Sequence, residues 1–595
     1  MDIKGILKPL TAWKRAFQPP HTIEVPNKKI REAAERYRGF HVNDIEKCIG
    51  CGTCAAICEN EAIKMVKVKD PQKGDSGYRP RIDYGRCCWC ALCVDVCPTG
   101  SLEMTNEYTW VRESADDFIF IPGVDEIGHE EKKDKGYKKD PELNFLNLKR
   151  VPMRELDGKE RVNTFAEVVL GYMEEEARKE AERCIGCGLC ISGCPARMHI
   201  PDYIRAIAEG DDVKSLNIIY ENNPMPEMCG KVCTRRCEFE CSLGHLGEPV
   251  AIRWLKRYVV EQFDDLKKYV KAEPQPLNGK KVGIVGAGPA GLTAAYYLRL
   301  KGYETEIFEA APKAGGMTFL GIPKYRFPIP SLDKQVELIE SVGVKIHYNS
   351  PVTPDKFEKM LKEYDAVFIA TGLPKGMSMR IEGEDHPQVI YAIDFLRKVN
   401  LGEKVEIGKD VVVVGGGNVA IDAVRVAKRL GANSFIAYRR RVVDMPADEE
   451  EIEATEHEGI PIYTQIIPLR VEDGPDGKVK LIYGKAKMVQ KEGERRPRPV
   501  LIEGEEYEYV VDRIIVAIGQ QPELSYLPEE IKNKIEMNRR LIKVNERQMT
   551  SIEKVFAGGD LTNWTADAIS AIADGMRAVK GIEMYLNGEL SWEKK

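Results

Sequence analysis

The chain has 595 residues, of which 43% are hydrophobic and 31% are charged, and its formal net charge is −6. This length exceeds what a single hydrophobic core serves, so we expect several domains. The balance of charge gives no electrostatic reason to bind nucleic acid, and no apolar run reaches the roughly 20 residues that a membrane span needs. The N-terminus lacks the pattern of a signal peptide, so we expect a cytoplasmic protein that is not integral to a membrane.

The first 17 residues carry apolar side chains at helical spacing, which predicts an amphipathic helix. Its apolar face is Ile3, Ile6, Leu7, Leu10, Trp13 and Phe17. Three interpretations of this face stay open: packing on its own domain, docking on a partner subunit, or contact with a membrane.

All 17 cysteines lie between Cys48 and Cys241, and 16 of them form four quartets. The first three quartets have the spacing C-x2-C-x2-C-x3-C, which wraps three thiolates around one cubane and sends the fourth to a neighbouring cluster. Zinc sites also use C-x2-C pairs, but a long gap separates the two pairs. We therefore predict four [4Fe–4S] clusters. Cys88 does not fit the C-x2-C-x2-C-x3-C spacing, which Cys87 keeps, so we do not expect Cys88 to be a ligand. The predicted ligands are Cys48, Cys51, Cys54, Cys58, Cys87, Cys90, Cys93, Cys97, Cys184, Cys187, Cys190, Cys194, Cys229, Cys233, Cys237 and Cys241.

The first two quartets resemble the 8Fe bacterial-type ferredoxin fold, and the lead-in "ILKPLTAWKRAFQPPHTIEVP" resembles that of the 8Fe subunit of complex I and membrane hydrogenases. The resemblance implies a ferredoxin-like 2[4Fe–4S] domain in residues 1–110. The chain then loses its cysteines and becomes charged, as in "HEEKKDKGYKKDPE" (129–142), which predicts a solvated linker in residues 111–160. The ferredoxin resemblance also implies two interlocked ligand sets: Cys48, Cys51, Cys54 and Cys97 for one cluster, and Cys87, Cys90, Cys93 and Cys58 for the other.

From Phe165 onward the sequence resembles the family of the glutamate synthase small subunit, which includes part of dihydropyrimidine dehydrogenase and the large subunit of NADPH-dependent ferredoxin oxidoreductases. The matching segments are "CIGCGLCISGCPARMHIP", "CGKVCTRRCEFEC" and "GEPVAIRWLKRYV". The resemblance implies a helical 2[4Fe–4S] domain in residues 161–270. In it, Cys194, Cys233, Cys237 and Cys241 would hold one cluster, and Cys184, Cys187 and Cys190 the other. Lys256 stands at the family's position for the fourth ligand of the latter, so Cys229 and Glu248 remain as alternatives.

A Pro-rich segment then leads into the strand "KVGIV" and the turn Gly286-Ala-Gly288-Pro-Ala-Gly291. Glycines at this spacing permit the tight turn, the approach of a pyrophosphate and close packing of helix on strand. The following strand ends at Glu309, where an acid accepts the hydroxyls of a ribose. "AGG" (314–316), "ATG" (370–372) and "GGD" (558–560) resemble the other FAD signatures of flavoproteins with two dinucleotide domains, and Asp560 resembles the residue that contacts the ribityl chain.

A second fingerprint follows the strand "DVVVV", at Gly415-Gly-Gly417-Asn418-Val419-Ala420. The next strand ends in Arg439, Arg440 and Arg441 instead of an acid, which favours a 2′-phosphate and therefore NADP(H). The nesting implies a glutathione-reductase-like FAD domain in residues 280–405 and 516–595, with an NAD(P)H-binding domain inserted in residues 406–515. The predicted nucleotide-binding residues are Gly286, Gly288, Pro289, Ala290, Gly291, Glu309, Gly315, Gly316, Thr371, Gly372, Gly415, Gly417, Asn418, Val419, Ala420, Arg439, Arg440, Gly519, Gly559 and Asp560.

No cysteine follows Cys241, so the flavin segments carry no thiol pair to accept electrons. No catalytic Ser/His/Asp or paired-carboxylate arrangement stands out either. The favoured interpretation is an electron-transfer subunit that links NADP(H), FAD and four clusters to ferredoxin, or to a catalytic subunit such as a hydrogenase or formate dehydrogenase, with bifurcation left open. The alternatives are a glutamate synthase-type small subunit, a stand-alone ferredoxin:NADP oxidoreductase, and a redox scaffold with regulatory nucleotide sites.

Overall fold

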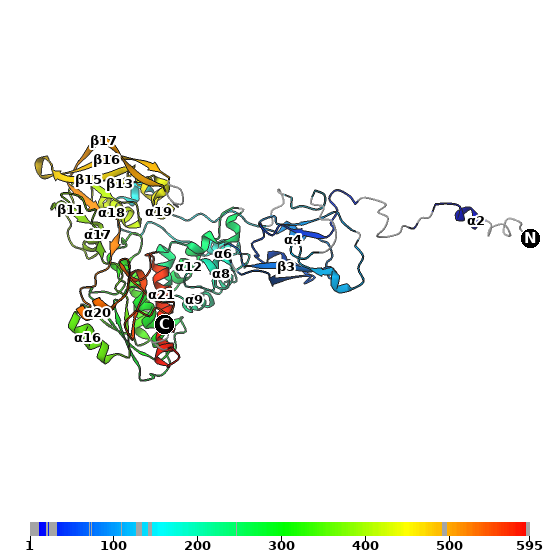
Figure 1. The fold of residues 1–595 in the computed structure, drawn as a ribbon, viewed down its shortest axis with the longest axis horizontal. Helices are drawn as coiled ribbons and strands as arrows, with labels where there is room; N and C mark the ends of the chain where they lie inside the picture. The colour runs from blue at the N-terminus through cyan, green and yellow to red at the C-terminus, as the bar shows by residue number, and fades with distance from the viewer. Residues whose placement is uncertain are drawn as a thin grey trace, which may run out of the picture. The chain divides into compact units, whose positions relative to one another are not determined.

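The computed structural model describes residues 11–19, 22, 33–70, 72, 74–108, 110–126, 134–140, 146–245, 247–490 and 497–590 (Figure 1). The chain divides into two compact units. The first comprises residues 1–149, 185–189 and 240–249, and the second comprises residues 150–184, 190–239 and 250–595. Among the described helices, none has the length and the apolar character that crossing a membrane requires.

The first unit is built on two small antiparallel sheets, β1–β4 and β2–β3–β5. Its elements are α2 (Thr11–Ala16), β1 (His41–Asn43), α3 (Thr53–Ala56), β2 (Ile63–Lys67), β3 (Tyr78–Asp83), α4 (Leu92–Asp95), β4 (Leu102–Met104) and β5 (Ile119–Phe120). The helices α3 and α4 each start one residue after a left-handed N-cap, which is Gly52 in one case and Ala91 in the other. The core gathers Phe40, Ile82 and Phe120 around the cysteine loops.

The predicted linker differs from the structure at its start. β5 pairs with β3, and Phe118 and Phe120 pack on the core of the first unit, so residues 115–120 belong to the ferredoxin fold. Further along, the Tyr137 hydroxyl donates to Asp95 Oδ1 at 2.9 Å. The aromatic side chains draw this segment onto the core because burying them removes apolar surface from water.

The second unit begins with a helical part, in which short helices surround the later cysteines. These helices are α5 (Gly158–Arg161), α6 (Glu174–Ala181), α7 (Leu189–Gly193), α8 (Ile200–Ala208), α9 (Asp212–Tyr220), α10 (Pro226–Val232), α11 (Arg236–Phe239) and α12 (Ile252–Glu261). The first residue of α7 belongs to the first unit. The helix α12 is buried along most of its length, including Lys256.

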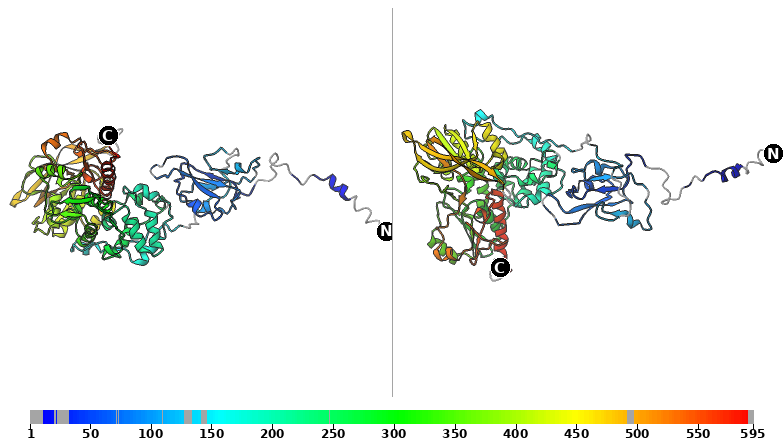
Figure 2. Two further views of the ribbon diagram at one scale, coloured as in Figure 1. Left: turned by 90° about the horizontal axis from the view of Figure 1, so that it is seen from below. Right: turned by 45° about the horizontal axis from the view of Figure 1, so that its top comes forward.

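A five-stranded parallel sheet in the order β22-β9-β6-β7-β8 forms the first nucleotide fold. Its β6 is an apolar run that is buried after its first residue. The helix α21 lies alongside α13, and Figure 2 shows it in red in two views. The elements of this part are β6 (Lys281–Val285), α13 (Pro289–Leu300), β7 (Glu304–Phe308), α14 (Met317–Leu320), α15 (Ile329–Ser341), β8 (Lys345–His347), α16 (Pro354–Glu363), β9 (Ala366–Ile369), β10 (Lys375–Gly376), β19 (Gln520–Gln521), α20 (Glu529–Lys534), β20 (Met537–Asn538), β21 (Leu541–Ile542), β22 (Val555–Ala557) and α21 (Ala568–Leu586).

A second parallel sheet in the order β11-β18-β12-β13-β14 forms the other nucleotide fold, and the antiparallel sheet β15-β16-β17 is inserted after β14. Its elements are β11 (Val389–Tyr391), α17 (Ala392–Asn400), β12 (Asp410–Val414), α18 (Asn418–Arg429), β13 (Asn433–Tyr438), α19 (Glu449–His457), β14 (Ile462–Thr464), β15 (Ile466–Asp473), β16 (Val479–Val489), β17 (Arg498–Val511) and β18 (Arg513–Val516). β11 pairs with β18, and α17 packs on this core through Phe395 and Leu396. The second nucleotide fold therefore already includes Val389, ahead of the expected boundary at residue 406.

The short antiparallel pair β10–β19 lies where the chain passes between the two nucleotide folds. Buried ion pairs of Arg326 also join them, and further buried ion pairs lie beside these inside the second nucleotide fold. Arg326, which follows α14, donates to Asp422 Oδ1 on α18 at 2.8 Å. Arg425 and Arg429 both donate to Glu458, at 2.7 and 2.8 Å, just beyond the end of α19. These charges lie away from water, so their pairing is what makes their burial tolerable.

Candidate functional site

The cysteines of the first unit lie in two groups. A small cavity is lined by Cys48, Cys51, Cys54 and Cys97, among other residues. Cys54 is half-buried, and its thiol interacts electrostatically with the other three and with Cys93. Of the two sets that the ferredoxin resemblance implies, this one is therefore gathered around one cavity.

The second group centres on Cys93, whose thiol interacts with those of Cys87, Cys90 and Cys58. Backbone N–H groups point at two of these sulfurs: Ala62 N donates to Cys58 Sγ at 3.3 Å, and Trp89 N donates to Cys87 Sγ at 3.4 Å. Hydrogen bonds of this kind stabilise charge on cluster sulfurs. Cys88 is exposed.

Burial raises the pKa values of several of these thiols, whereas hydrogen bonds from residues 99–102 lower that of Cys97. The pKa of Cys51 rises to about 11, mainly through burial, and that of Cys93 rises to about 12 through burial and the neighbouring thiols. A thiolate at these positions therefore needs a compensating positive centre, which iron supplies. Among the described residues, no three His, Cys, Asp or Glu side chains converge on the position of a single metal ion. A cubane differs from such a site because each of its irons takes one thiolate.

Several polar side chains around the sulfurs escaped the sequence analysis. Thr53 Oγ1 lies 3.2 Å from Cys51 Sγ, and Ser101 Oγ lies 3.4 Å from Cys97 Sγ. His41 Nε2 lies 3.3 Å from Cys93 Sγ. Thr53 and Ser101 stand within four residues of a ligand candidate and could have been suspected, whereas His41 precedes Cys93 by 52 residues and gave no signal.

In the second unit, Cys194, Cys233 and Cys237 lie around the buried Lys256. Burial disfavours the charge of Lys256, but the thiols of Cys229, Cys233, Cys237 and Cys194 outweigh it and hold the pKa of Lys256 above its ordinary value. A hydrogen bond with Cys229 lowers the pKa of Cys233 to about 7. The third and fourth quartets are each divided between the two units, so their assembly into clusters stays a prediction.

The first glycine turn connects β6 to α13 at the carboxyl edge of the sheet. Gly286 has a φ of +100°, and a Cβ there would lie 2.7 Å from the carbonyl oxygen of Ala370. A Cβ on Gly291 would lie 2.0 Å from the carbonyl oxygen of Gly286. Gly316 (φ +55°) approaches Gly288 equally closely, with 2.9 Å between its ideal Cβ and the Cα of Gly288. These close approaches leave no room for side chains at the three glycines, so their backbone is open to a pyrophosphate.

Two acids face this turn. Glu309 follows β7, and its Oε2 accepts a hydrogen bond from Ala287 N at 2.7 Å. Asp560 is half-buried, and its buried Oδ1 atom has no hydrogen-bond partner. Burial and the neighbouring Asp567 and Asp574 raise the pKa of Asp560 to about 7. An unpartnered buried carboxylate oxygen beside a nucleotide fold fits a hydroxyl-bearing ligand such as the ribityl chain of FAD.

Other predicted flavin-site residues complete this edge. Thr371 Oγ1 lies 3.0 Å from the Tyr526 hydroxyl, Gly372 has a φ of +61° with open space around it, and Gly315 and Gly519 also have positive φ. A Cβ on Gly559 would lie 3.1 Å from Ala290 Cβ, so the "GGD" turn packs on the start of α13.

The second glycine turn connects β12 to α18. Gly415 has a φ of +149°, and a Cβ there would lie 2.2 Å from the carbonyl oxygen of Ala517. Gly417 is extended and open, and it caps α18, whose first residues are Asn418, Val419 and Ala420. Helix N-termini of this kind bind phosphate through their free N–H groups.

The three arginines at the end of β13 differ in their contacts. Arg441 Nε donates to Asp444 Oδ2 at 2.8 Å, so this side chain is engaged within its own turn. Arg439 is exposed, and the Nε atom of Arg440 is buried without a hydrogen-bond partner. Arg439 and Arg440 are therefore better placed than Arg441 to receive a phosphate.

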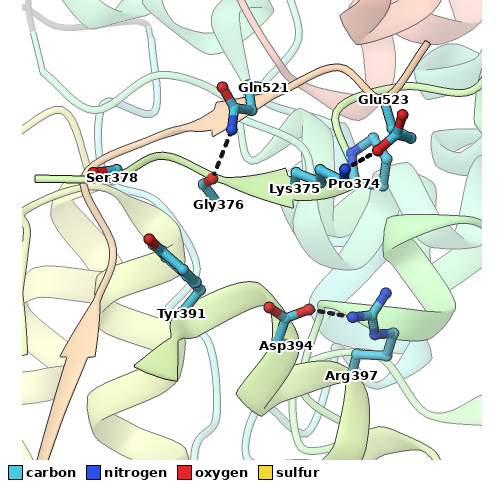
Figure 3. Close-up of a pocket in the computed structure, with 9 residues that line it drawn as sticks. All are labelled: Pro374, Lys375, Gly376, Ser378, Tyr391, Asp394, Arg397, Gln521 and Glu523. Carbon is cyan, nitrogen blue, oxygen red and sulfur yellow. Dashed lines mark hydrogen bonds and ion pairs between the residues drawn. The ribbon is translucent and has the colours of Figure 1, made fainter. Parts of the chain in front are cut away.

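A cavity of about 450 Å³ lies beside the β10–β19 pair. Figure 3 shows Lys375, Gly376, Gln521 and Glu523 on one side and Tyr391, Asp394 and Arg397, from the start of α17, on the other. Lys375 pairs with Glu523 and Arg397 with Asp394, so these four charges are balanced in pairs. The sequence analysis did not single out this cavity, because its lining comes from segments far apart in the chain.

Three family models match consecutive parts of the chain. Residues 47–101 match the 4Fe-4S dicluster domain, and residues 161–268 match dihydropyrimidine dehydrogenase domain II, a 4Fe-4S cluster domain. Residues 280–575 match the pyridine nucleotide-disulphide oxidoreductase model. The expected fold class is thereby confirmed, as are FAD, [4Fe–4S] clusters and NADP(H) as cofactors.

Among curated proteins, the chain is 38% identical over 430 residues to the NADPH-Fe(3+) oxidoreductase subunit beta of Geobacter sulfurreducens, covering 67% of this chain and 63% of the relative. It is also 38% identical to the NADP(+)-dependent formate dehydrogenase subunit beta of Moorella thermoacetica, covering 67% of this chain and 60% of that protein. The chain thus spans under two thirds of the length of these two relatives.

The glutamate synthase [NADPH] small chain of Azospirillum brasilense is matched over 92% of its own length and 72% of this chain, at 32% identity. The order of iron–sulfur and nucleotide domains, both glycine turns and this near-complete match agree with one another. The chain belongs to the family of the glutamate synthase small chain, whose members are iron–sulfur flavoprotein oxidoreductases.

Proposed function

We propose that this chain is the electron-transfer subunit of a larger oxidoreductase, which exchanges electrons between NADP(H) and a partner protein. The observation that carries the proposal is the presence, in one chain, of two complete nucleotide folds and four cysteine quartets, without any cysteine after Cys241. FAD supplies the exchange between a two-electron hydride and single electrons, which [4Fe–4S] clusters carry.

On this proposal the two nucleotide folds have different ligands. Glu309 and the Gly286–Gly291 turn hold the adenosine and pyrophosphate of FAD, and Asp560 accepts a hydrogen bond from its ribityl chain. The Gly415–Ala420 turn holds the pyrophosphate of NADP(H), and Arg439 and Arg440 bind the 2′-phosphate by charge-assisted hydrogen bonds. No side chain is assigned a proton transfer, so the chain contributes by orienting its ligands.

The quartet cysteines hold four clusters, with Cys54 among the ligands of the first and Cys93 among those of the second. In the second unit, the cation of Lys256 takes no iron; it stabilises negative charge on the sulfurs around Cys194, Cys233 and Cys237. The fourth ligand of the Cys184, Cys187 and Cys190 cluster is Cys229 or Glu248. So many reduced thiols suit the cytoplasm, where we place the chain.

The partner is ferredoxin or a catalytic redox subunit, and formate dehydrogenase is one candidate because a relative is named as its beta subunit. We propose that the N-terminal segment, residues 1–17, binds this partner protein. In the described part of that segment, the side chains of Trp13 and Phe17 are 65% and 84% exposed. Exposed aromatic side chains of this kind are typical of protein–protein interfaces. Ile3, Ile6, Leu7 and Leu10 lie outside the described residues.

A glutamate synthase-type small subunit is the second candidate, because the small chain of that enzyme is matched almost end to end. The two candidates differ in the partner that co-purifies: a glutamate synthase large chain in one case, and a ferredoxin or a formate- or hydrogen-oxidising subunit in the other.

Anaerobic purification of the chain, with metal and flavin analysis, tests the proposal. Four cubanes require about sixteen irons per chain, together with one FAD and no zinc. The isolated chain should also reduce viologen dyes with NADPH. A chain that binds its cofactors but reduces no dye would favour the scaffold with regulatory nucleotide sites, and eight irons with stoichiometric zinc would remove one pair of clusters.

A further inference from the structure

The loop between Cys233 and Cys237 contacts both nucleotide folds. Thr234 Oγ1 donates to Asp567 Oδ2 at 3.4 Å, and Arg236 forms an ion pair with the same carboxylate. Asp567 caps α21, since its Oδ1 accepts a hydrogen bond from Ser570 N at 2.8 Å. The side chains of Thr234 and Arg236 therefore reach the first nucleotide fold.

The residue between them reaches the other fold. Arg235 Nη2 donates to Asp448 Oδ1 at 2.9 Å, and its guanidinium also pairs with Glu450. Arg235 is 8% exposed and has a φ of +45°, a backbone conformation that costs a non-glycine residue free energy and persists only where its surroundings hold it. The strained residue thus turns its side chain away from those of its neighbours.

Asp448 continues the connection to the second glycine turn. Its side chain caps α19 by accepting a hydrogen bond from Glu450 N at 3.1 Å. Its backbone N–H donates to Asn418 Oδ1 at 2.8 Å, and Asn418 is the first residue of α18, directly after Gly417. A continuous path of two side-chain contacts therefore runs from the cysteine loop to the phosphate-binding end of α18.

A second arginine stiffens the same path. Arg253 on α12 donates to the carbonyl oxygen of Cys233 at 3.3 Å and forms an ion pair with Glu450. Glu450 thus forms ion pairs with two arginines, Arg235 in the cysteine loop and Arg253 on α12. A displacement of Asp448 or α19 should therefore also move this loop, because leaving these buried charges unpaired would cost free energy.

We propose that Arg235 and Asp448 are positioning residues that couple occupancy of the NADP(H) site to the redox state of the Cys233–Cys237 cluster. The inference rests on the proposed ligands of that cluster and that site. Hydrogen bonds and charge near the sulfurs set a cluster's reduction potential, so a loop that moves with Asn418 changes the potential when the nucleotide binds. Linkage makes the effect reciprocal: reduction of the cluster changes the nucleotide's affinity by the same factor.

The test measures the dissociation constant of 2′-phosphoadenosine diphosphoribose, which has the pyrophosphate and the 2′-phosphate but no nicotinamide to reduce. Titration calorimetry on the full, cofactor-loaded chain, oxidised and then reduced with dithionite, should give dissociation constants that differ roughly fivefold or more. In R235Q and D448N this ratio should fall toward one. The EPR spectrum of the reduced clusters should change with the analogue in wild type and not in these two variants.

R236Q is the matched control, because Arg236 belongs to the same loop but contacts the other fold; it should keep the wild-type ratio. R235K, which restores the charge, should recover part of the ratio, and iron content shows that each variant retains its clusters. Equal ratios in wild type and D448N, or a ratio of one in a wild type that binds the analogue, would overturn the coupling. If the wild type bound no analogue at all, the proposed NADP(H) site itself would be wrong.

Discussion

Discrimination between NADP(H) and NAD(H) depends on single residues, because the three consecutive arginines at the end of β13 have different surroundings. Changing Arg439 and Arg440 to Ala should weaken NADPH binding by about 1.5–3 kcal/mol for each charged hydrogen bond lost, and should leave NADH nearly unaffected. Steady-state KM values for both nucleotides measure this. R441A is the control, since Arg441 is held by Asp444 and its loss should matter less. A wild-type preference for NADH would contradict the assignment.

Asp560 gives a pH dependence whose sign follows from its raised pKa. The pKa of about 7 in the folded chain lies above the ordinary value of 3.8, so ionisation is costlier in the folded state. The resulting loss of stability begins as the pH rises above about 4 and is complete above about 7; at full burial it is on the order of a few kcal/mol. In the flavin-free full chain, D560N should therefore raise the thermal midpoint more at pH 8 than at pH 5. An equal gain at both pH values would contradict the raised pKa of Asp560.

At the scale of elements, the two glycines of the β12–α18 turn should respond differently to a methyl group. At Gly415 a Cβ would meet the carbonyl oxygen of Ala517, so G415A should destabilise the fold by roughly 1–3 kcal/mol. At Gly417 the nearest atom, Pro446 Cγ, is 3.9 Å away, so G417A should fold normally but weaken NADP(H) by obstructing the pyrophosphate. Thermal midpoints and nucleotide dissociation constants separate the two effects. Similar stability losses in both variants would disagree with this account.

Local patterns were enough to predict the elements around the glycine turns, since a buried apolar strand, glycines at fixed offsets and a helix all lie within about 20 residues. Elements that depend on distant partners were missed. The strand β5 was not predicted and lies within the expected linker. It has only two residues, which are too few to show an alternating pattern. Phe165 and Val169 pack against the core of the second nucleotide fold, although more than 200 residues separate them from most of it. The contacts of Arg235 and Arg236 span 213 and 331 residues, and no spacing rule reaches so far.

At the scale of the whole molecule, the N-terminal segment offers a test of assembly. Phe40 belongs to the buried core of the first unit, so a deletion should stop at residue 32 and leave that core intact. Removing residues 1–32 should preserve NADPH-dependent dye reduction, release the partner in a pull-down and abolish the coupled reaction. The paired variant W13A/F17A should weaken the partner by the loss of two aromatic anchors.

Leu277, 59% exposed in the Pro-rich segment, supplies the control: L277A should keep the partner. If the shortened chain retained both the partner and the coupled activity, docking would have to occur elsewhere on the molecule.

The buried ion network between the two nucleotide folds has a consequence for heat. Removing charges from water costs free energy, and this cost falls as the temperature rises, because the hydration of charged groups becomes less favourable. The ion pairs of Arg326 with Asp422 and Glu451, which join the two folds, therefore hold them together more effectively in warm solution than in cold. Cooling should therefore weaken this junction together with the apolar cores, because hydrophobic stabilisation also declines in the cold.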